Sequence, residues 1–474
     1  MPLTRVSPDD PAPSRPPRLT ALVVAAALFM QNMDSTVIAT ALPAMAAGFG
    51  SDVVTLSLAL TAYMLSLAVF IPASGWLADR FGARRVFQAA IIVFTVGSAL
   101  CGLAPSLVFL VAARIVQGMG GALMVPVGRL VLLRSVPKSQ LVSAMAWLSI
   151  PALIGPLLGP PVGGLIVTHV SWRWIFALNL PVGLIGLVLA TRVIPETRGT
   201  ASRRLDGPGL ALSGVALAGV ILGGELLTKP VLGVPAGLGV LAVGLAAGAV
   251  YLRHARRSAR PVLDLRLLSV PSFGLSVAAG TLFRIGVGAI PFLLPSMIQV
   301  GFGWSAAEAG LITFSASVGA IAMKMAAAPL LRRFGFRRLL VANGVASAVS
   351  IGAMGLLGAG WPIWAMHLML AVGGFFRSLQ FTAFNTVAFA DIRRHRTADA
   401  TGFYSTAQQV SLTLGVVAAA GALETAMRIS GRAVPGAGDF SAAFFAVTLV
   451  AVLAVPVCLR LPADAGDVMA GRGG

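Results

Sequence analysis

Long apolar segments recur along almost the whole chain, and they constrain its fold more than any other feature. Each is about 20 residues long, the length that an α-helix needs to cross the hydrocarbon core of a bilayer. Hydrophobic residues form 57% of the chain and charged residues only 11%, whereas a soluble domain carries about 25% charged residues. The sequence therefore predicts an all-α integral membrane protein.

The sequence contains fourteen such apolar segments. Each is expected to form a transmembrane helix, because lipid offers no hydrogen-bond partner to an irregular backbone. The predicted helices lie at residues 19–43, 55–75, 86–104, 107–131, 141–167, 175–195, 208–228, 232–252, 270–298, 304–328, 339–358, 361–388, 400–424 and 440–460.

The basic residues predict which side of the membrane each loop faces. The net charge is +19, and Lys and Arg are enriched in cytoplasmic loops of membrane proteins. With both termini placed inside, the outer loops hold only Arg173, Lys229, Arg428 and Arg432. This asymmetry predicts cytoplasmic termini and an even number of helices. It also argues against nucleic-acid binding, because the basic residues are scattered over short loops.

The spacing of the helices predicts three folded parts. The longest cytoplasmic stretches, 196–207 and 253–269, flank a helix pair with few polar residues, and six helices remain on either side of that pair. The expected folded parts are an N-terminal six-helix bundle at 19–195, an inserted transmembrane hairpin at 208–252 and a C-terminal six-helix bundle at 270–461. A disordered, Pro-rich cytoplasmic tail at 1–18 is expected to precede them.

One basic segment occurs twice, about half a chain length apart. Residues 75–86 read GWLADRFGARRV and residues 328–339 read APLLRRFGFRRL, and the two align without a gap. Each copy is expected to form a tight basic hairpin between two apolar segments. Because two related membrane halves are the usual build of secondary transporters, this repeat predicts a transport function.

Four motifs in order identify a resemblance to a known family. Besides the segment at 75–86, residues 33–43 read MDSTVIATALP, residues 114–122 read RIVQGMGGA and residues 155–164 read GPLLGPPVGG. Together they resemble the major facilitator superfamily, specifically its fourteen-helix drug:proton antiporter branch of the EmrB/QacA type, over the whole chain. The stretch FRSLQFTAFN at 376–385 further resembles the MdtD-like subgroup.

The resemblance implies that the first basic loop is a conformational latch. In the family the Asp of this motif, here Asp79, contacts the end of a helix in the other half and steadies the outward-facing state. Gly75 and Gly82 allow a sharp turn, and the loop is anchored at the cytoplasmic face by Arg80, Arg84 and Arg85. A solvated loop that only sets topology is the alternative. The second copy has Arg332 in place of Asp79, so no equivalent latch is expected there.

Asp34 and Arg114 are the predicted proton-coupling pair. Counted along their helices at about 1.5 Å per residue, both lie roughly 12–14 Å from the outer surface. The family packs these two helices side by side, so the two charges could meet. A charge inside a membrane helix is costly unless it is paired or hydrated, and protonation of Asp34 would release Arg114. A purely structural ion pair is the alternative.

The segment at 155–164 is the predicted antiporter motif. Glycines recur at every fourth position and form one smooth stripe, which permits close helix packing, while prolines favour a bend. In the family this segment seals the cavity and allows the two bundles to rock; ordinary small-residue packing is the alternative. The motif residues are Gly155, Pro156, Gly159, Pro160, Gly163 and Gly164.

Cationic side chains inside the second half bear on the cargo. Arg284, Lys324 and Arg377 fall within predicted helices, and no acidic partner is evident at that depth. A cationic cavity wall favours anionic or neutral amphipathic cargo, although a snorkelling Lys and backbone-bound Arg would be merely structural. The candidate cavity and substrate residues are Gln31, Gln117, Arg284, Lys324, Arg377, Gln380 and Asn385.

The leading hypothesis is a proton-coupled exporter of small organic molecules or drugs in the bacterial inner membrane, working by alternating access. An exporter of an anionic metabolite or metal chelate is the rival within transport. A membrane enzyme or passive channel fits less well, because no catalytic constellation or nucleotide-binding motif is found. No metal site or cofactor is expected. The expected partners are protons, a small-molecule substrate and the bilayer. The chain is expected to be a monomer, although some family members feed an adaptor and an outer-membrane duct.

Overall fold

The computed structural model describes residues 17–136, 141–196, 205–228, 233–259, 261–393 and 396–470. Residues 1–16, which make up most of the predicted disordered tail, lie outside this part. Within these ranges the chain forms helices and turns and no strand. The predicted all-α fold is confirmed.

Eight α-helices precede the first long polar stretch. They are α1 (Pro17–Gly48), α2 (Val53–Phe70), α3 (Ser74–Phe81), α4 (Ala83–Gly102), α5 (Leu107–Ser135), α6 (Leu141–His169), α7 (Trp174–Ala177) and α8 (Asn179–Val193). The inserted pair consists of α9 (Gly207–Thr228) and α10 (Val234–Arg257).

The second half repeats the pattern of long helices. It contains α11 (Pro271–Ser296), α12 (Ala306–Phe334), α13 (Phe336–Met354), α14 (Ile363–Val387), α15 (Thr397–Ser430), α16 (Ala437–Val452), α17 (Ala454–Cys458) and α18 (Asp467–Ala470). Three short helical turns join the longer helices: η1 (Ile71–Ala73) follows α2 in the first half, and η3 (Leu265–Ser269) and η4 (Met297–Gly301) precede and follow α11 in the second half.

Each of the fourteen predicted segments coincides with one long helix or with two consecutive shorter ones. Among the described residues, eleven helical runs are long and apolar enough to cross a membrane. Several helices extend beyond the predicted ends. For example, α1 continues past Pro43 to Gly48, because neighbouring helices in a bundle can satisfy the backbone groups that a proline frees.

The first basic loop differs from the predicted hairpin. Most of 75–86 is helical, and α3 continues from α2 through η1. Within this segment the helix is interrupted only at Gly82, whose φ is 94°. Gly335 interrupts the helical run between α12 and α13 in the same way, with φ of 73°. Side chains other than glycine rarely adopt this conformation. The backbone angle therefore explains why glycine stands at the same place in both copies.

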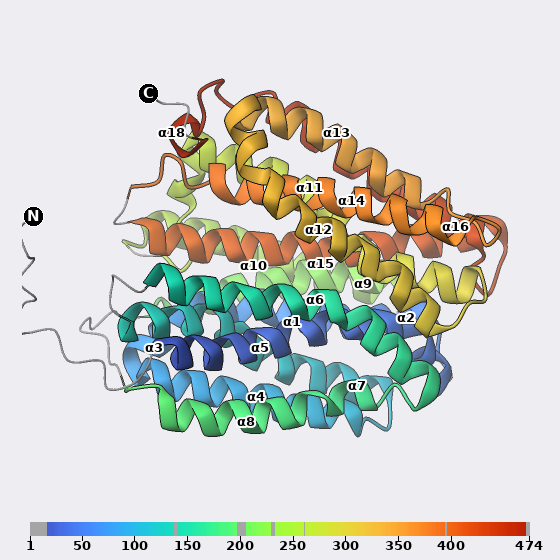
Figure 1. Ribbon diagram of the computed structural model, residues 1–474, viewed down its shortest axis with the longest axis horizontal. Coiled ribbons are helices and arrows are strands. Elements are labelled where there is room, and N and C mark those ends of the chain that lie inside the picture. Colours follow the sequence, from blue (N-terminus) through green and yellow to red (C-terminus); the bar gives the residue numbers. More distant parts are fainter. Residues whose placement is uncertain are drawn as a thin grey trace, which may run out of the picture.

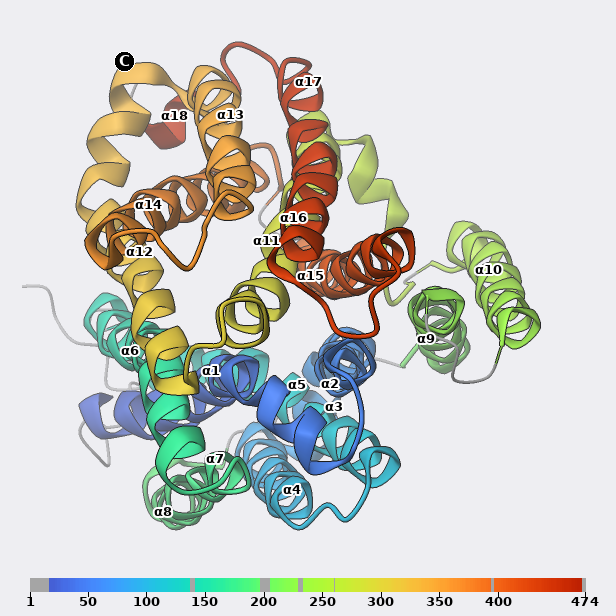
Figure 2. The ribbon, with the colours of Figure 1, turned by 90° about the vertical axis from the view of Figure 1, so that its right-hand side faces the viewer.

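The helices form two groups with the inserted pair at one side. Seen end-on, α1–α8 lie together, α11–α17 lie together, and α9 and α10 stand outside both groups (Figure 2). The helix α1 begins at the same end of the molecule at which α18 lies (Figure 1). We call this the near end and the opposite one the far end.

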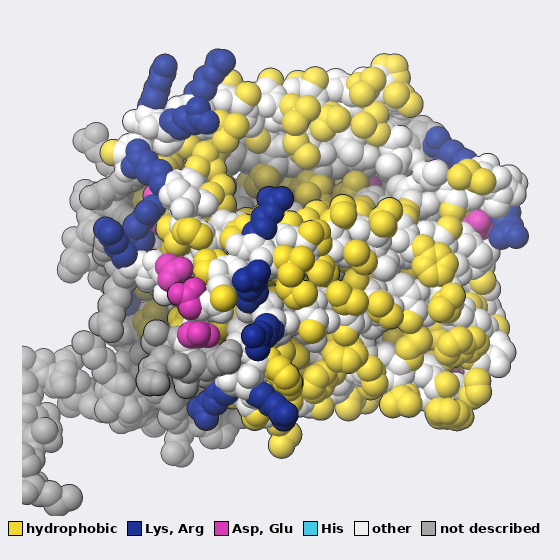
Figure 3. All heavy atoms as spheres, turned by 90° about the horizontal axis from the view of Figure 1, so that it is seen from above, with side chains coloured by type: hydrophobic (Ala, Val, Ile, Leu, Met, Phe, Trp, Pro, Cys, Tyr) yellow, Lys and Arg dark blue, Asp and Glu magenta, His cyan; other side chains and the backbone are white. Residues whose placement is uncertain are grey.

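Charge is distributed unevenly along the molecule. On the face drawn in Figure 3, most Lys and Arg side chains gather toward the left, on the side of the near end, and hydrophobic side chains cover much of the remainder. This is the arrangement expected of a protein whose apolar belt faces lipid.

The helices α12 and α14 pack at backbone distance through paired glycines. A Cβ atom at Gly319 would overlap the carbonyl oxygen of Ala371, and one at Gly374 would overlap that of Ala316. Since a backbone atom cannot move aside, Gly319→Ala is expected to destabilise the fold by about 1–3 kcal/mol. Gly239→Ala in α10, which meets no atom within 4 Å, is the matched control.

Thermal unfolding in detergent measures this effect. The two cysteines, Cys101 and Cys458, are free and buried, so a thiol-reactive dye reports unfolding. An unchanged midpoint for Gly319→Ala would show that α12 and α14 do not pack as described.

Candidate functional site

A charged network is buried among four helices of the first half. Arg114 of α5 donates from Nη1 to Asp34 Oδ2 at 2.7 Å and to Gln117 Oε1 at 2.7 Å. Gln117 donates from Nε2 to Asp34 Oδ1 at 2.8 Å. Asn179 of α8 donates to the same oxygen at 2.8 Å and to Ser98 Oγ of α4 at 3.0 Å. The carboxylate of Asp34 thus accepts hydrogen bonds from three side chains.

The guanidinium of Arg114 has further partners on α2. Its Nε donates to the carbonyl oxygen of Ala59 at 3.3 Å, and its Cζ lies 4.1 Å from the ring centroid of Tyr63. Side-chain exposure is 0% for Arg114 and 2% for Asp34. A buried ion pair is costly unless hydrogen bonds satisfy its remaining donors and acceptors. This network satisfies both oxygens of Asp34 and the Nε and Nη1 atoms of Arg114, whereas Nη2 of Arg114 has no hydrogen-bond partner among the described residues.

Glycines bring the helices of this network close together. A Cβ atom at Gly97 of α4 would lie 2.6 Å from the backbone of Gln117, and one at Gly118 of α5 would lie 2.8 Å from the carbonyl oxygen of Tyr63. The smooth surfaces of α4 and α5 therefore let short side chains such as Ser98 reach the network.

The structure joins Asp34, Arg114 and Gln117, which the sequence had singled out. Asn179 and Ser98 were not predicted. Asn179 is a polar residue within an apolar segment, and that signal could have indicated it; the sequence does not show that it faces Asp34.

The first basic loop is bound within its own half. Asp79 accepts a hydrogen bond from Arg134 at the end of α5, at 2.5 Å, and both side chains are partly exposed. Arg84 donates to the carbonyl oxygen of Thr191, and Arg85 lies 3.6 Å from Glu196. The family pattern implies a contact of Asp79 with the other half, but in this structure the carboxylate pairs with Arg134 in the last turn of α5, a helix of its own half.

The glycine stripe of α6 packs on α1. Cβ atoms at Gly155 and Gly163 would lie 3.0 Å from the carbonyl oxygens of Phe29 and Val37, and one at Gly159 would overlap the hydroxyl of Thr36. The stripe thus fixes the helix that carries Asp34.

The same segment also meets the other half. A Cβ atom at Gly164 would overlap the carbonyl oxygen of Ala306 in α12, and one at Gly310 of α12 would overlap that of Pro160. Ser317 donates to the carbonyl oxygen of Pro156 at 3.2 Å. The predicted motif thus forms a contact between α6 and α12 that runs from the far end toward the middle of the molecule.

Two buried arginines lie in the second half. Arg284 of α11 donates to Tyr404 at 2.5 Å and to Asn385 at 3.3 Å, and it lies over the rings of Phe381 and Tyr404. Its Nε and Nη1, and Nη1 of Arg377, have no hydrogen-bond partner. Neither arginine forms an ion pair with any described residue.

The remaining candidates fall in different surroundings. Lys324 donates to Thr382 at 3.3 Å. Gln380 is bound between α13 and α14, where it accepts from Asn343 at 2.7 Å and donates to the carbonyl oxygen of Leu340 at 2.9 Å. Its polar atoms are used inside the bundle, so the structure supports packing rather than a place in an open cavity wall. Gln31 is buried, and its Oε1 has no partner.

Comparisons with known proteins agree with the resemblance seen in the motifs. The model of the Major Facilitator Superfamily matches residues 24–416 and 276–469. Relatives that carry the name multidrug resistance protein MdtD include one from Cronobacter sakazakii, 38% identical over 93% of this chain and 94% of its own length. Another, from Serratia proteamaculans, is 38% identical over 83% of this chain and 82% of its own length.

Solved structures show the same fold. A crystal structure of a D-xylose-proton symporter matches 94% of this chain and 98% of its own with a TM-score of 0.67, at 16% identity. A POT family transporter in complex with 5-aminolevulinic acid matches 94% and 96% with a TM-score of 0.66, also at 16% identity. This membrane transporter, which is not an enzyme, belongs to the Major Facilitator Superfamily.

Proposed function

We propose that the protein is a proton-coupled antiporter that exports small organic molecules or drugs by alternating access. The observation that carries the proposal is the buried network around Asp34. A carboxylate deep in a membrane protein, bound to an arginine and two amides, can exist in two protonation states. The relatives are named multidrug resistance proteins, and these names support drugs as the cargo.

The geometry supports a specific coupling step. When Asp34 is ionised, it joins α1 to α5 and α8 through Arg114, Gln117 and Asn179. A proton on Asp34 removes the negative charge that balances Arg114, which weakens this connection. Proton binding and helix packing therefore act on the same group, as antiport requires.

The proposed setting is the bacterial inner membrane, with the near end and both termini in the cytoplasm. The gathering of Lys and Arg toward the near end supports this orientation. In this proposal the protein works as a monomer with the proton as its only coupling ion and no cofactor.

Transport in proteoliposomes tests the proposal. Vesicles carrying the protein receive a pH step, and the internal pH is followed while cationic, neutral and anionic compounds are added. The wild type is expected to move protons only when its cargo is present. Asp34→Asn is expected to abolish this cargo-dependent movement, because the amide cannot take up a proton in this pH range. The substitution keeps the size of the side chain.

The matched control is Glu424→Gln, which removes a partly exposed carboxylate paired with Arg428 at 3.0 Å. This variant is expected to transport like the wild type. Coupled transport that survives in Asp34→Asn would place the coupling elsewhere, and no response to any compound would contradict drug export.

The alternative cargo is an anionic metabolite or metal chelate. It is favoured by Arg284 and Arg377, two buried guanidinium groups with unpaired N–H donors. Uncompensated charge is costly in a membrane protein, and an anionic ligand would compensate it. In the same experiment, a response restricted to the anionic compounds would favour this alternative.

A further inference from the structure

A second carboxyl group is buried where the inserted pair meets both halves. Glu225 of α9 is 0% exposed, and Thr61 of α2 donates to its Oε1 at 2.5 Å. The residue lies three positions before Thr228, at which α9 ends at the far end. The Asp34 network contains residues of α1, α4, α5 and α8 and does not include Glu225.

An apolar cluster lies one helical turn from Glu225, on the side of the near end. Leu65 of α2, Ile221 of α9 and Val417 of α15 form the centre of this cluster. Residues four positions apart lie on the same face of a helix, and Glu225 and Thr61 are each one turn from a member of this cluster, toward the far end. The carboxyl therefore lies in the next layer of the same junction.

The third helix of the junction is α15. Val417 lies 3.4 Å from the position that a Cβ atom at Gly224 would occupy. One turn farther along, a Cβ atom at Gly421 would lie 2.7 Å from Thr228 Cγ2. In this layer α9 packs closely on a helix of the second half, while Thr61 belongs to the first half.

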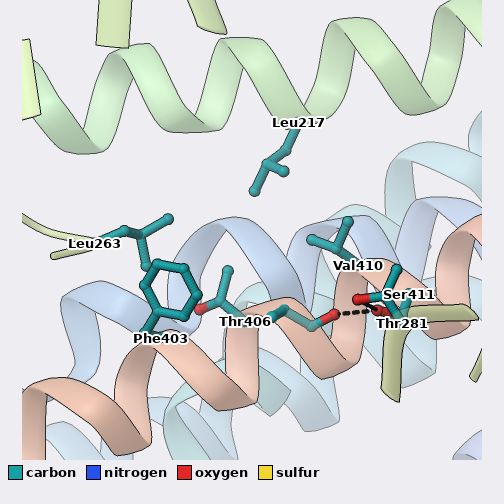
Figure 4. Close-up of a pocket in the computed structure, with 8 residues that line it drawn as sticks. Leu217, Leu263, Thr281, Phe403, Thr406, Val410 and Ser411 are labelled. Carbon is teal, nitrogen blue, oxygen red and sulfur yellow. Dashed lines mark hydrogen bonds between the residues drawn. The ribbon is translucent and has the colours of Figure 1, made fainter. Parts of the chain in front are cut away.

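Toward the near end the pair stands away from α15. A pocket of about 200 Å³ separates them, and Leu217 of α9 points across it toward Phe403, Thr406 and Val410 (Figure 4). Ser411 and Thr281, hydrogen-bonded at 3.0 Å, lie on the far side of the pocket from Leu217. The close attachment of the pair to α15 is therefore in the layers that include Glu225.

Among the described residues, most charged side chains on the helices packed around this carboxyl lie toward the near end. The helix α2 contains no Asp, Glu, Lys, Arg or His, and its one phenol is Tyr63. On α10, the titratable groups Tyr251, Arg253, His254, Arg256 and Arg257 fall in the last two turns, at the near end. On α15, Asp399 and Tyr404 are at the near end, and the far end holds Glu424 and Arg428, which pair with each other.

We propose that Glu225 is a second proton-binding site, and that its protonation sets how the α9–α10 pair attaches to the two halves at the far end. Ionised, the carboxylate holds Thr61 by a charge-assisted hydrogen bond. Protonated, it loses this charge-assisted bond, and the junction between α2, α9 and α15 loosens. The inference goes beyond antiport through Asp34, because it concerns the position of the pair and not the cargo.

Spin labels on the pair and on the second half test this directly. Leu238 of α10 and Ile429 of α15 are exposed near the far end, and cysteines there, with Cys101 and Cys458 replaced by Ala, accept the labels. Pulsed EPR distances are recorded in nanodiscs across a pH series. Two distance populations are expected, whose ratio follows the binding of one proton.

Three variants separate Glu225 from other groups. Glu225→Gln is expected to keep the low-pH distance population at every pH, whereas Asp34→Asn is expected to titrate like the wild type. Thr61→Val removes the donor to the ionised form, so the transition is expected to move about one pH unit higher. This variant retains the carboxyl and serves if Glu225→Gln fails to fold.

Three results would overturn the proposal: a wild type whose distances do not change with pH, a Glu225→Gln protein that titrates like the wild type, or a Thr61→Val midpoint that does not move. None of these readouts depends on transport, so loss of cargo-driven proton flux in the vesicle experiment would leave this test unaffected.

Discussion

Arg114→Ala is expected to destabilise the protein by about 3–5 kcal/mol, because it leaves the carboxylate of Asp34 buried without its cation. The side chain of Arg114 is 0% exposed, and it also binds Gln117 and the carbonyl oxygen of Ala59. The measurement is the unfolding midpoint in detergent, with the thiol reactivity of Cys458 as the readout.

A double variant shows that charge is the cause. Asp34→Asn combined with Arg114→Ala removes the uncompensated carboxylate, so the double variant is expected to be more stable than Arg114→Ala alone. The control is Arg428→Ala, which breaks an exposed pair with Glu424 that contributes about 0.5 kcal/mol or less. Equal losses for Arg114→Ala and the double variant would mean that lost packing, and not buried charge, dominates.

Gly164→Val is expected to shift the protein strongly toward the state that is open at the far end. Gly164 meets the backbone of Ala306 without room for a side chain, so Val cannot be accommodated while α6 and α12 touch. In the proposed cycle this contact must separate when the far end opens. Overpacking against backbone costs about 1–3 kcal/mol, which changes a two-state population ratio by roughly 5- to 150-fold.

Solvent access to the interface measures this shift. A cysteine in place of Ser317, which contacts Pro156 across the two halves, is expected to react faster with a membrane-impermeant thiol reagent in the Gly164→Val background. Gly239→Val, at a position with no atom within 4 Å, is the matched control and should leave the rate unchanged. An equal rate in both backgrounds would show that α6 and α12 do not close the far end.

The Asp34 network shows how far sequence reasoning reaches toward the site. The depths of Asp34 and Arg114, counted along two apolar helices, predicted a contact only together with the family resemblance, which implied that the two helices are neighbours. The structure places the two charges 2.7 Å apart. The partner of Asp79 could not be obtained in this way. Arg134 lies at the end of a different helix, and nothing in the sequence distinguishes it from the other arginines at the near end as the partner of Asp79.

Gln380 and Glu225 illustrate the same limit within the membrane. Both are polar residues in apolar segments, and the sequence gives their depth without their direction. The structure turns Gln380 toward Asn343 inside the second half and Glu225 toward Thr61 at a junction of three helices.

The sequence alone determined the all-α membrane fold and the approximate positions of fourteen helices, because lipid requires about 20 apolar residues in each span and internal hydrogen bonding throughout. It also indicated close helix packing at the glycine stripe of residues 155–163. Only the tertiary structure decided which polar side chains meet. Lipid and neighbouring helices are both apolar, so a membrane helix has no strong amphipathic pattern to fix its rotation. Partners such as Asn179, Ser98 and Thr61 follow from that rotation.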